Sequence, residues 1–176
     1  MVLDIVTRHV PTSVERIDLL KRQQRSVNAL YGTDWTQTLL LDPHQAGINA
    51  SHVRMRSYEP CAQYAWVLDD DDLCVERDLL AKIDQTADLN VFQMTHLALG
   101  VIPPAAYMRD QVLSRGKVGC ACVIVSHDLW MRVRDQWGEK YDGDADFLLA
   151  ARKHAERIAW IPHVIAAVDR VSYGSC

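Results

Sequence analysis

The sequence predicts a single α/β domain in which helices cover both faces of a mainly parallel sheet, giving three layers. Three observations predict this fold. Short apolar runs alternate with helical patterns along the 176 residues. The first 42 residues have the order strand, helix, strand, which implies a parallel pair joined by a right-handed crossover. No repeat, linker or low-complexity tract divides the chain.

The composition is that of a globular protein, with 49% apolar and 24% charged residues. The net charge of -4 leaves no basic stripe of the kind that nucleic-acid binding produces. No stretch approaches the roughly 18 apolar residues of a membrane helix, and the opening MVLDIVTRHV differs from a signal peptide. The five cysteines are scattered, which favours small buried residues in a reducing cytosol. We therefore expect a cytoplasmic protein.

The first elements follow from local patterns. Residues 2–6 (VLDIV) form an apolar run typical of a strand. Thr12 with Glu15 three residues later has the pattern of a capping box and predicts the start of a helix. One face of this helix carries four apolar residues: Ile17, Leu20, Val27 and Leu30. The run 35–41 (WTQTLLL) predicts the second strand, which ends at Asp42.

The rest of the chain continues the alternation of strands and helices. The polar segment 44–60 is typical of a loop with one short helix. Further strands are predicted at 64–68, 90–94 and 118–125, and one or two closing strands at 158–168, split by Pro162. Further helices are predicted at 75–84, at 126–137 with Ser126 as N-cap, and at 144–153.

Four consecutive aspartates, Asp69–Asp72, directly follow the strand 64–68. In an open α/β sheet, ligands bind at the carboxyl ends of the strands. Alternate residues of such a turn point in similar directions, which makes Asp69 and Asp71 the natural pair to share one divalent cation. Oxygen ligands suit Mg²⁺ or Mn²⁺, which also bind substrate phosphates. A solvated acidic turn is the alternative, but apolar residues on both sides of the run favour the metal site.

A second acidic group occurs in the segment 141–152 (YDGDADFLLAAR), where Asp142, Asp144 and Asp146 precede an apolar helix. Acidic residues at a helix start can act as N-caps and interact favourably with the helix dipole. A carboxylate at a helix start that faces a metal site can equally serve as a general base. The residues alone leave both roles open.

In this order the motifs resemble those of the GT-A fold glycosyltransferases, which are Rossmann-like, and most closely the family 2-type nucleotide-sugar enzymes. The opening LDIVTRHVPTSVERIDLLKRQQRSVNAL is similar to the first strand and helix of that family, and LLLD at 39–42 to its second strand. YAWVLDDDDL is similar to its strand followed by D-x-D-D, and GDADFLLAAR to its late E-D-x-D motif. The resemblance covers nearly the whole chain and implies one domain over 1–176.

The resemblance implies a metal-dependent, inverting hexosyl- or pentosyltransferase. Such an enzyme uses Mn²⁺ or Mg²⁺ to move a sugar from a nucleotide-diphosphate donor to an acceptor hydroxyl, on a glycan, lipid, protein or modified nucleic acid. The implied metal ligands are Asp71, Asp69 and, as a third ligand, His163. The implied nucleotide-sugar contacts are Thr7, Arg8, Asp42, Asp69, Asp70 and Arg170. Asp144, or else Asp146, would be the base that deprotonates the acceptor.

The chain departs from the family pattern in three ways. Gly143 replaces the usual acidic residue before Asp144, so that the base could instead be Asp146 or Asp142. No D-G-S sequence follows the second strand, and 176 residues is short for the family. His163 has an alternative role as a core or loop histidine.

Two other functions fit parts of the pattern. VLDDDDLCV and GDADF resemble the acidic motifs of haloacid dehalogenase-type phosphatases, although that family places its nucleophilic aspartate on the first strand. Gly143 and the short chain also fit a noncatalytic metal-binding or assembly module that keeps a transferase fold.

Overall fold

The structure is a computed structural model that describes residues 1–11, 13–41, 47–138 and 143–168. The described residues form eight strands in one sheet: β1 (Leu3–His9), β2 (Trp35–Leu41), β3 (Tyr64–Val67), β4 (Asp72–Cys74), β5 (Leu89–His96), β6 (Gly100–Ile102), β7 (Val123–Ser126) and β8 (Ile158–Val168). The α-helices are α1 (Val14–Val27), α2 (Gly47–Ser57), α3 (Leu79–Lys82), α4 (Ala105–Asp110), α5 (His127–Val133) and α6 (Gly143–His154). Two 3₁₀ turns are η1 (Cys120–Cys122) and η2 (Arg134–Gln136).

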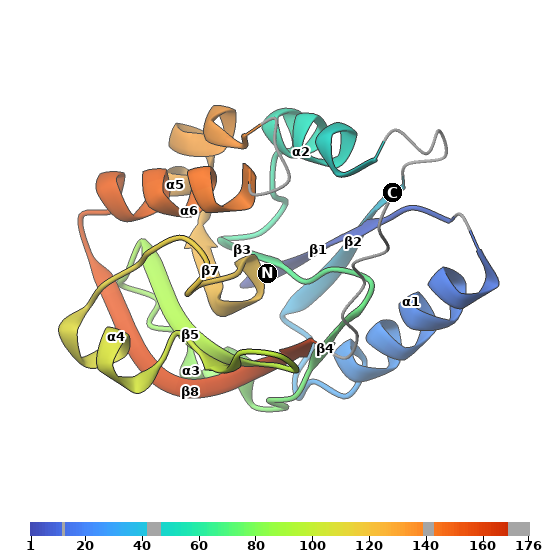
Figure 1. The fold of residues 1–176 in the computed structure, drawn as a ribbon, viewed down its shortest axis with the longest axis horizontal. Helices are drawn as coiled ribbons and strands as arrows, with labels where there is room; N and C mark the ends of the chain where they lie inside the picture. The colour runs from blue at the N-terminus through green and yellow to red at the C-terminus, as the bar shows by residue number, and fades with distance from the viewer. Residues whose placement is uncertain (12, 42–46, 139–142, 169–176) are drawn as a thin grey trace.

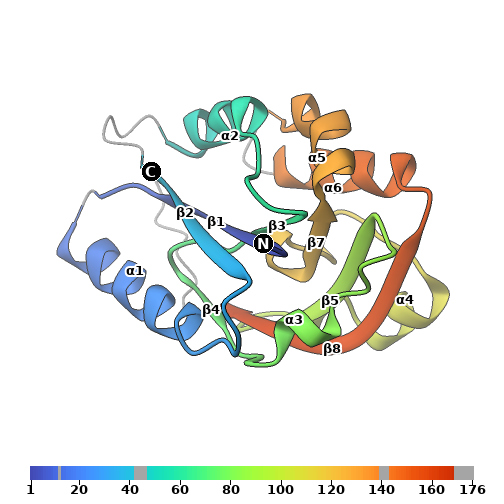
Figure 2. The same cartoon turned by 180° about the vertical axis from the view of Figure 1, so that it is seen from behind.

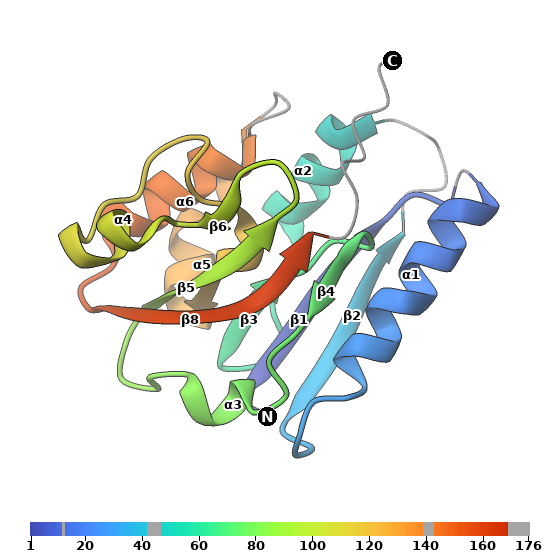
Figure 3. The ribbon, with the colours of Figure 1, turned by 60° about the horizontal axis from the view of Figure 1, so that its bottom comes forward.

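The sheet has the strand order β2-β1-β3-β7-β5-β8-β4, with β6 paired to β5. β1 is parallel to β2 and β3, and β5 is parallel to β8. Because β7 is antiparallel to both β3 and β5, the strands β1, β2, β3, β5 and β8 all point the same way. Figure 3 shows their arrowheads at one end of the sheet. The predicted α/β fold with a mainly parallel sheet is confirmed.

The sheet curls, and its two edges approach each other. In a flat sheet, β3 and β4 would lie about 19 Å apart, because β7, β5 and β8 separate them. Only the four residues 68–71 join these two strands, so the sheet has to bend back. Helices α2, α5 and α6 cover one face, while α1 lies on the other side and contacts β4 (Figures 1 and 2).

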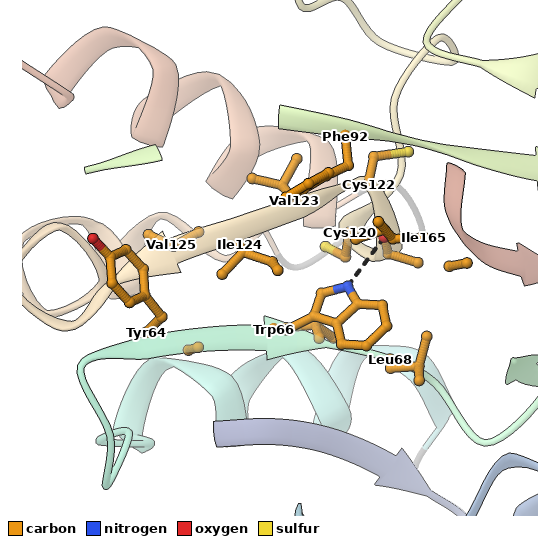
Figure 4. Packing of buried hydrophobic residues seen from close by; sticks show 14 of the residues in the cluster. Tyr64, Trp66, Leu68, Phe92, Cys120, Cys122, Val123, Ile124, Val125 and Ile165 are labelled. Atoms are coloured by element: carbon orange, nitrogen blue, oxygen red, sulfur yellow. Dashed lines mark hydrogen bonds between the residues drawn. The ribbon is translucent and has the colours of Figure 1, made fainter. Parts of the chain in front are cut away.

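A continuous apolar core fills the space between the sheet and the helices. Trp66 of β3 is fully buried, and its indole N–H donates to the Ala121 carbonyl at 3.0 Å (Figure 4). This bond ties the central strand to η1. Cys120 and Cys122 lie in that buried turn rather than in the predicted strand 118–125, of which only the last part, β7, is extended. Both are small buried residues, as predicted.

Helix α1 begins one residue later than the predicted cap implies. The side chain of Ser13 accepts a hydrogen bond from the Arg16 amide at 3.2 Å and caps the helix, while Thr12 lies outside the described residues. The buried face of α1 carries Leu19, Gln23 and Val27, spaced four residues apart, whereas Ile17 is exposed. Because Gln23 is polar, the apolar pattern did not include it, and the predicted apolar face therefore differs in part from the buried face.

The largest error of the sequence prediction concerns residues 72–84. A helix was predicted from residue 75, but residues 72–74 form β4, and the Val75 amide donates to the Ile165 carbonyl at 2.9 Å. Only α3, four residues long, remains helical. Pairing with the edge of β8 overrides the local helical pattern. The remaining predicted helices match α5 and α6, and Ser126 caps α5 by accepting from the Leu129 amide.

Candidate functional site

The aspartate run lies in the turn between β3 and β4, at the end of the sheet toward which β1, β2 and β3 point. The turn is tight, because the Asp72 amide donates to the Asp69 carbonyl at 3.0 Å. Asp70 and Asp72 are buried, whereas the side chains of Asp69 and Asp71 are 30% and 12% exposed. Burial therefore follows the alternation that the sequence predicts.

Arg8, at the end of β1, holds Asp69. Its Nε donates to Asp69 Oδ1 at 2.6 Å, and its Nη2 pairs with Oδ2. The guanidinium carbon lies 5.6 Å from the centre of the Trp137 ring. Among the described residues, the buried Nη1 has no hydrogen-bond acceptor. Burial alone would lower the pKa of Arg8, but the Asp69 carboxylate outweighs it and raises that pKa, so the charge of Arg8 is fixed.

Asp70 is the buried centre of a second charged group. Its Oδ2 lies 2.5 Å from His9 Nδ1, and its Oδ1 lies 2.5 Å from Arg16 Nη2. Arg16, in the first turn of α1, also reaches Asp71 at 3.5 Å. Among the described residues, Arg8 and Arg16 thus stand beside the four carboxylates.

Two aspartates of the run have raised pKa values, chiefly because they are buried. Burial raises the pKa of Asp72 well above its usual range, and repulsion from Asp69 and Asp71 adds to this effect. Burial likewise raises the pKa of Asp70 to about 6, because it outweighs the opposing effects of His9 and Arg16. A cation placed among these carboxylates would relieve both costs.

We expect the metal-free protein to lose the contribution of Asp70 to stability as the pH rises. A carboxyl whose pKa is raised from 3.8 to about 6 on folding stabilises the fold fully below pH 4 and loses this effect through pH 6, by up to about 3 kcal/mol. The measurement is the free energy of unfolding in EDTA, for the wild type and Asp70→Asn, between pH 4 and 7.5. The wild type should lose stability relative to the variant over that range. The opposite slope would mean that His9 and Arg16 dominate.

Among the described residues, no three His, Cys, Asp or Glu side chains converge where they could hold a metal ion. His163 does not join the aspartates. Its Nε2 pairs with Glu76, and it lies five residues before Val168, the register partner of Asp72 on β8. Five residues of strand span about 16 Å. The structure therefore places the expected third ligand beside a glutamate, well down the strand from the site.

Thr7 is fully buried beneath the site. Its Oγ1 accepts hydrogen bonds from Gln23 Nε2 at 2.9 Å and from Gln37 Nε2 at 2.8 Å. These bonds join β1 to α1 and β2, and the nucleotide contact of Thr7 stays a prediction. Asp42 and Arg170 lie outside the described residues, and so does Asp142.

Two late aspartates lie in the first turn of α6. Asp144 Oδ1 accepts the Ala145 amide at 2.8 Å. Its charge is one of those that raise the pKa of Arg8, so it acts on the same buried arginine as the aspartate run. Asp146 pairs with Arg115 at the surface. The two candidate bases therefore differ: Asp144 accepts a backbone amide at the start of α6, whereas Asp146 pairs with an exposed arginine.

The absence of an acidic residue at position 143 has a packing cause. Gly143 is buried, and its backbone lies against Gly138 and the imidazole of His52. A Cβ at Gly143 would stand 2.6 Å from His52 Nδ1 and 2.7 Å from the Gly138 carbonyl carbon, closer than real Cβ contacts occur. This chain cannot place any side chain at that position without moving α2.

Gly143→Ala tests this contact. We expect the substitution to destabilise the protein by about 1–3 kcal/mol, since the clash involves backbone atoms that cannot rotate away. For a chain of this size the melting temperature should fall by roughly 2–12 °C. Differential scanning calorimetry measures the change. Gly119→Ala, at a φ of −123° and with only the flexible Met94 side chain near its Cβ, at 3.4 Å, controls for the addition of a methyl group; an equal loss in both variants would argue against the close approach.

The sequence did not predict that His9 and Arg16 pair with Asp70, or that Trp137 packs against Arg8. His9 and Arg8 belong to β1, which runs three residues beyond its predicted end at residue 6. The sequence contained a signal for this extension: the polar residues Thr7, Arg8 and His9 continue the apolar strand toward the edge of the sheet where the aspartates lie. Arg16 could have been suspected because the first turn of α1 follows that edge. Trp137 is fully buried.

No family model matches the sequence, and no curated protein is significantly similar to it. Solved structures do share the fold. Residues 1–349 of S. aureus TarS superpose with a TM-score of 0.69 at 14% identity, over 96% of this chain and 60% of that one. A longer structure of S. aureus TarS gives 0.69 at 13% identity, over 97% of this chain and 37% of that one. This chain thus spans under two thirds of both TarS structures.

A third structure is similar over nearly the full length of both chains. It is a glycosyltransferase involved in the glycosylation of the major capsid of PBCV-1, with a TM-score of 0.58 at 11% identity, over 98% of this chain and 95% of that one. No helix in the described part of the chain is long and apolar enough to cross a membrane. At these identities the likeness concerns the fold, and this chain has the α/β fold of these proteins, which include a glycosyltransferase.

Proposed function

We propose that this chain is a glycosyltransferase that moves a sugar from a nucleotide-diphosphate donor to an acceptor hydroxyl, with the help of a divalent metal ion and with inversion at the anomeric carbon. One observation carries the proposal: the run Asp69–Asp72 lies in a tight turn at the carboxyl edge of the sheet, with Arg8 and Arg16 paired to its carboxylates. The fold shared with a glycosyltransferase supports it.

The residues of the turn fit a hard divalent cation. Asp71 and Asp69 offer partly exposed carboxylate oxygens within one turn, beside the buried Asp70 and Asp72. Mg²⁺ and Mn²⁺ characteristically bind through one or two carboxylates together with water and substrate phosphates, so two protein ligands suffice. Asp71 and Asp69 would hold the ion, which when bound stabilises the charge of the departing diphosphate.

We assign the base to Asp144. Asp146 pairs with Arg115 at the surface, and Asp144, the residue that the family resemblance implies as the base, lies in the first turn of α6. In the proposed reaction the acceptor oxygen attacks the anomeric carbon, its proton passes to the Asp144 carboxylate, and the bond to the nucleotide diphosphate breaks with both electrons leaving on the phosphate oxygen. Attack opposite the leaving group inverts the configuration.

The remaining contacts with the donor form part of the same proposal. Arg8 is suited to bind an anion, because its buried Nη1 lacks an acceptor among the described residues. Asp70 is enclosed by His9 and Arg16, which suits a role in orienting the turn. Thr7, Asp42 and Arg170 remain the proposed neighbours of the nucleotide.

A binding screen tests the function. Uridine, guanosine and thymidine diphosphates, each with and without Mn²⁺, are added to the wild type, and unfolding is followed by thermal shift. A ligand at 100 times its Kd should add about 2.7 kcal/mol to the stability. We expect one nucleotide to stabilise the protein only when the metal is present, and its sugar conjugates then to be hydrolysed slowly without an acceptor. No binding by any nucleotide would overturn the function, and binding without turnover would favour the noncatalytic module.

A further inference from the structure

The two ends of the segment that precedes α6 lie side by side. The Gly138 amide donates to the Gly143 carbonyl at 3.0 Å, and a Cβ on Gly138 would stand 2.7 Å from Gly143 Cα. We call these two residues, with Trp137, the neck of the segment. Because Asp144 directly follows the neck, its backbone position depends on where the neck is held.

Helix α2 holds the neck from outside. His52 Nδ1 lies 3.0 Å from the Gly138 carbonyl oxygen, and Arg56 Nε donates to the Trp137 carbonyl at 2.7 Å. The two side chains are four residues apart, so they share one face of the helix. Buried carbonyl groups require partners, and α2 supplies them to two consecutive peptide units more than 80 residues away in sequence.

The ring of Trp137 also has close neighbours on three elements. It stacks on Phe147 of α6 at 4.5 Å between ring centres, lies 5.5 Å from the His52 ring, and has the Arg8 guanidinium near its face. The neck is therefore clamped between α2, α6 and β1. A shift of α2 would move the start of α6 relative to the aspartate run.

We propose that His52 and Arg56 are positioning residues for Asp144: by binding the Gly138 and Trp137 carbonyls, they set the position at which α6 begins and so the place of the catalytic carboxylate. This inference rests on the proposed transferase function. A displacement of a reacting group by about 1 Å can cost about 100-fold in rate, so the two hydrogen bonds should matter for turnover although neither side chain touches a substrate.

Matched variants isolate the two hydrogen bonds. Arg56→Gln keeps an N–H donor at the position of Nε, whereas Arg56→Met keeps the chain length without a donor. His52→Asn keeps a donor at the position of Nδ1, whereas His52→Leu does not. We expect the Met and Leu variants to lower kcat at least about tenfold, with donor Kd unchanged within twofold, and the Gln and Asn variants to recover most of the rate. Arg25→Ala removes a charge from an exposed site on α1 and should change nothing.

A double variant separates positioning from general damage. In the Asp144→Asn background, Arg56→Met should lower the residual rate no further, because the carboxylate that it positions is already absent. A full multiplicative loss in that background would overturn the proposal, as would a fall in donor affinity equal to the fall in kcat.

Amide hydrogen exchange tests, without any activity assay, whether His52 and Arg56 hold the start of α6 in place. The amides of residues 147–150, the first in α6 with intrahelical acceptors, should exchange about tenfold faster in Arg56→Met and His52→Leu than in the wild type and Arg25→Ala. Exchange rates equal to those of the wild type would overturn the proposal that His52 and Arg56 hold the start of α6. Absence of nucleotide binding and transfer in the wild type would instead overturn the proposed function, while the exchange data would still decide whether α2 sets the start of α6.

Discussion

Asp144→Asn is expected to lower the rate of sugar transfer by about 100- to 10,000-fold, the range that loss of a general base produces, while donor binding stays intact. The asparagine keeps an oxygen that can accept the Ala145 amide, as the carboxylate does at 2.8 Å, so the start of α6 should be preserved. What it loses is the ability to take a proton from the acceptor. The effect should therefore appear in kcat and leave the Kd of the nucleotide with Mn²⁺ unchanged.

Steady-state kinetics with the donor found in the binding screen measure this effect. Asp135→Asn is the matched control, because it removes a carboxylate from an exposed site in η2. If Asp144→Asn keeps the wild-type kcat and the loss occurs in Asp146→Asn, the role belongs to Asp146 and the ion pair with Arg115 has to open during turnover. A loss of donor affinity in Asp144→Asn would place this residue among the binding groups instead.

The parts of the fold that the sequence predicts are those governed by local chemistry. The strand, helix and strand of residues 3–41 follow from two apolar runs and a capped helix between them. α6 follows from acidic residues at its start and apolar residues behind them. In these segments the local pattern and the tertiary packing agree, and this agreement makes them predictable.

The errors occur in very short strands that pair at an edge of the sheet. β4 and β6 are three residues long, too short to carry a periodic signal, and each exists because an existing strand, β8 or β5, offers it hydrogen-bonding groups. The curl that brings β4 beside β8 depends on the whole sheet. No window of sequence near residue 72 contains that information.

The candidate site is predictable to the same extent. The location of the aspartates follows from a general rule about the carboxyl ends of strands, and their alternation follows from the geometry of an extended turn. Their cationic partners Arg8 and Arg16 come from β1 and α1, which the sequence places correctly but without the distances that form ion pairs. The role of α2 was out of reach, because it consists of contacts to backbone carbonyls, which no residue type in the neck reveals.

These ion pairs give the proposed metal site a property that separates it from a solvated acidic turn. In a solvated turn each carboxylate is screened by water, and removing one changes little. Here Asp72 is buried beside Asp69 and Asp71, and their repulsion helps to raise its pKa. Removing a carboxylate that only supports the turn should relieve this repulsion. Removing one that also binds the metal should relieve the repulsion but weaken metal binding.

Asp71→Asn should therefore change stability and donor binding in opposite directions. Its charge is among those that raise the pKa values of the buried Asp70 and Asp72, so removing it relieves repulsion, and the metal-free fold should be as stable as the wild type or more stable. Metal-dependent binding of the nucleotide diphosphate should weaken by at least about 100-fold, since loss of even an outer-shell partner costs about 10- to 100-fold in metal affinity.

Isothermal titration with the nucleotide at fixed Mn²⁺, together with urea unfolding in EDTA, measures the two effects on the same preparation. Asp18→Asn, on the exposed face of α1 beside Lys21, removes one carboxylate far from the turn and should alter neither quantity. Unchanged nucleotide affinity in Asp71→Asn would show that the ion is held elsewhere. A loss of stability in EDTA as large as the loss of binding would mean that Asp71 supports the turn and that the weaker binding follows from local unfolding.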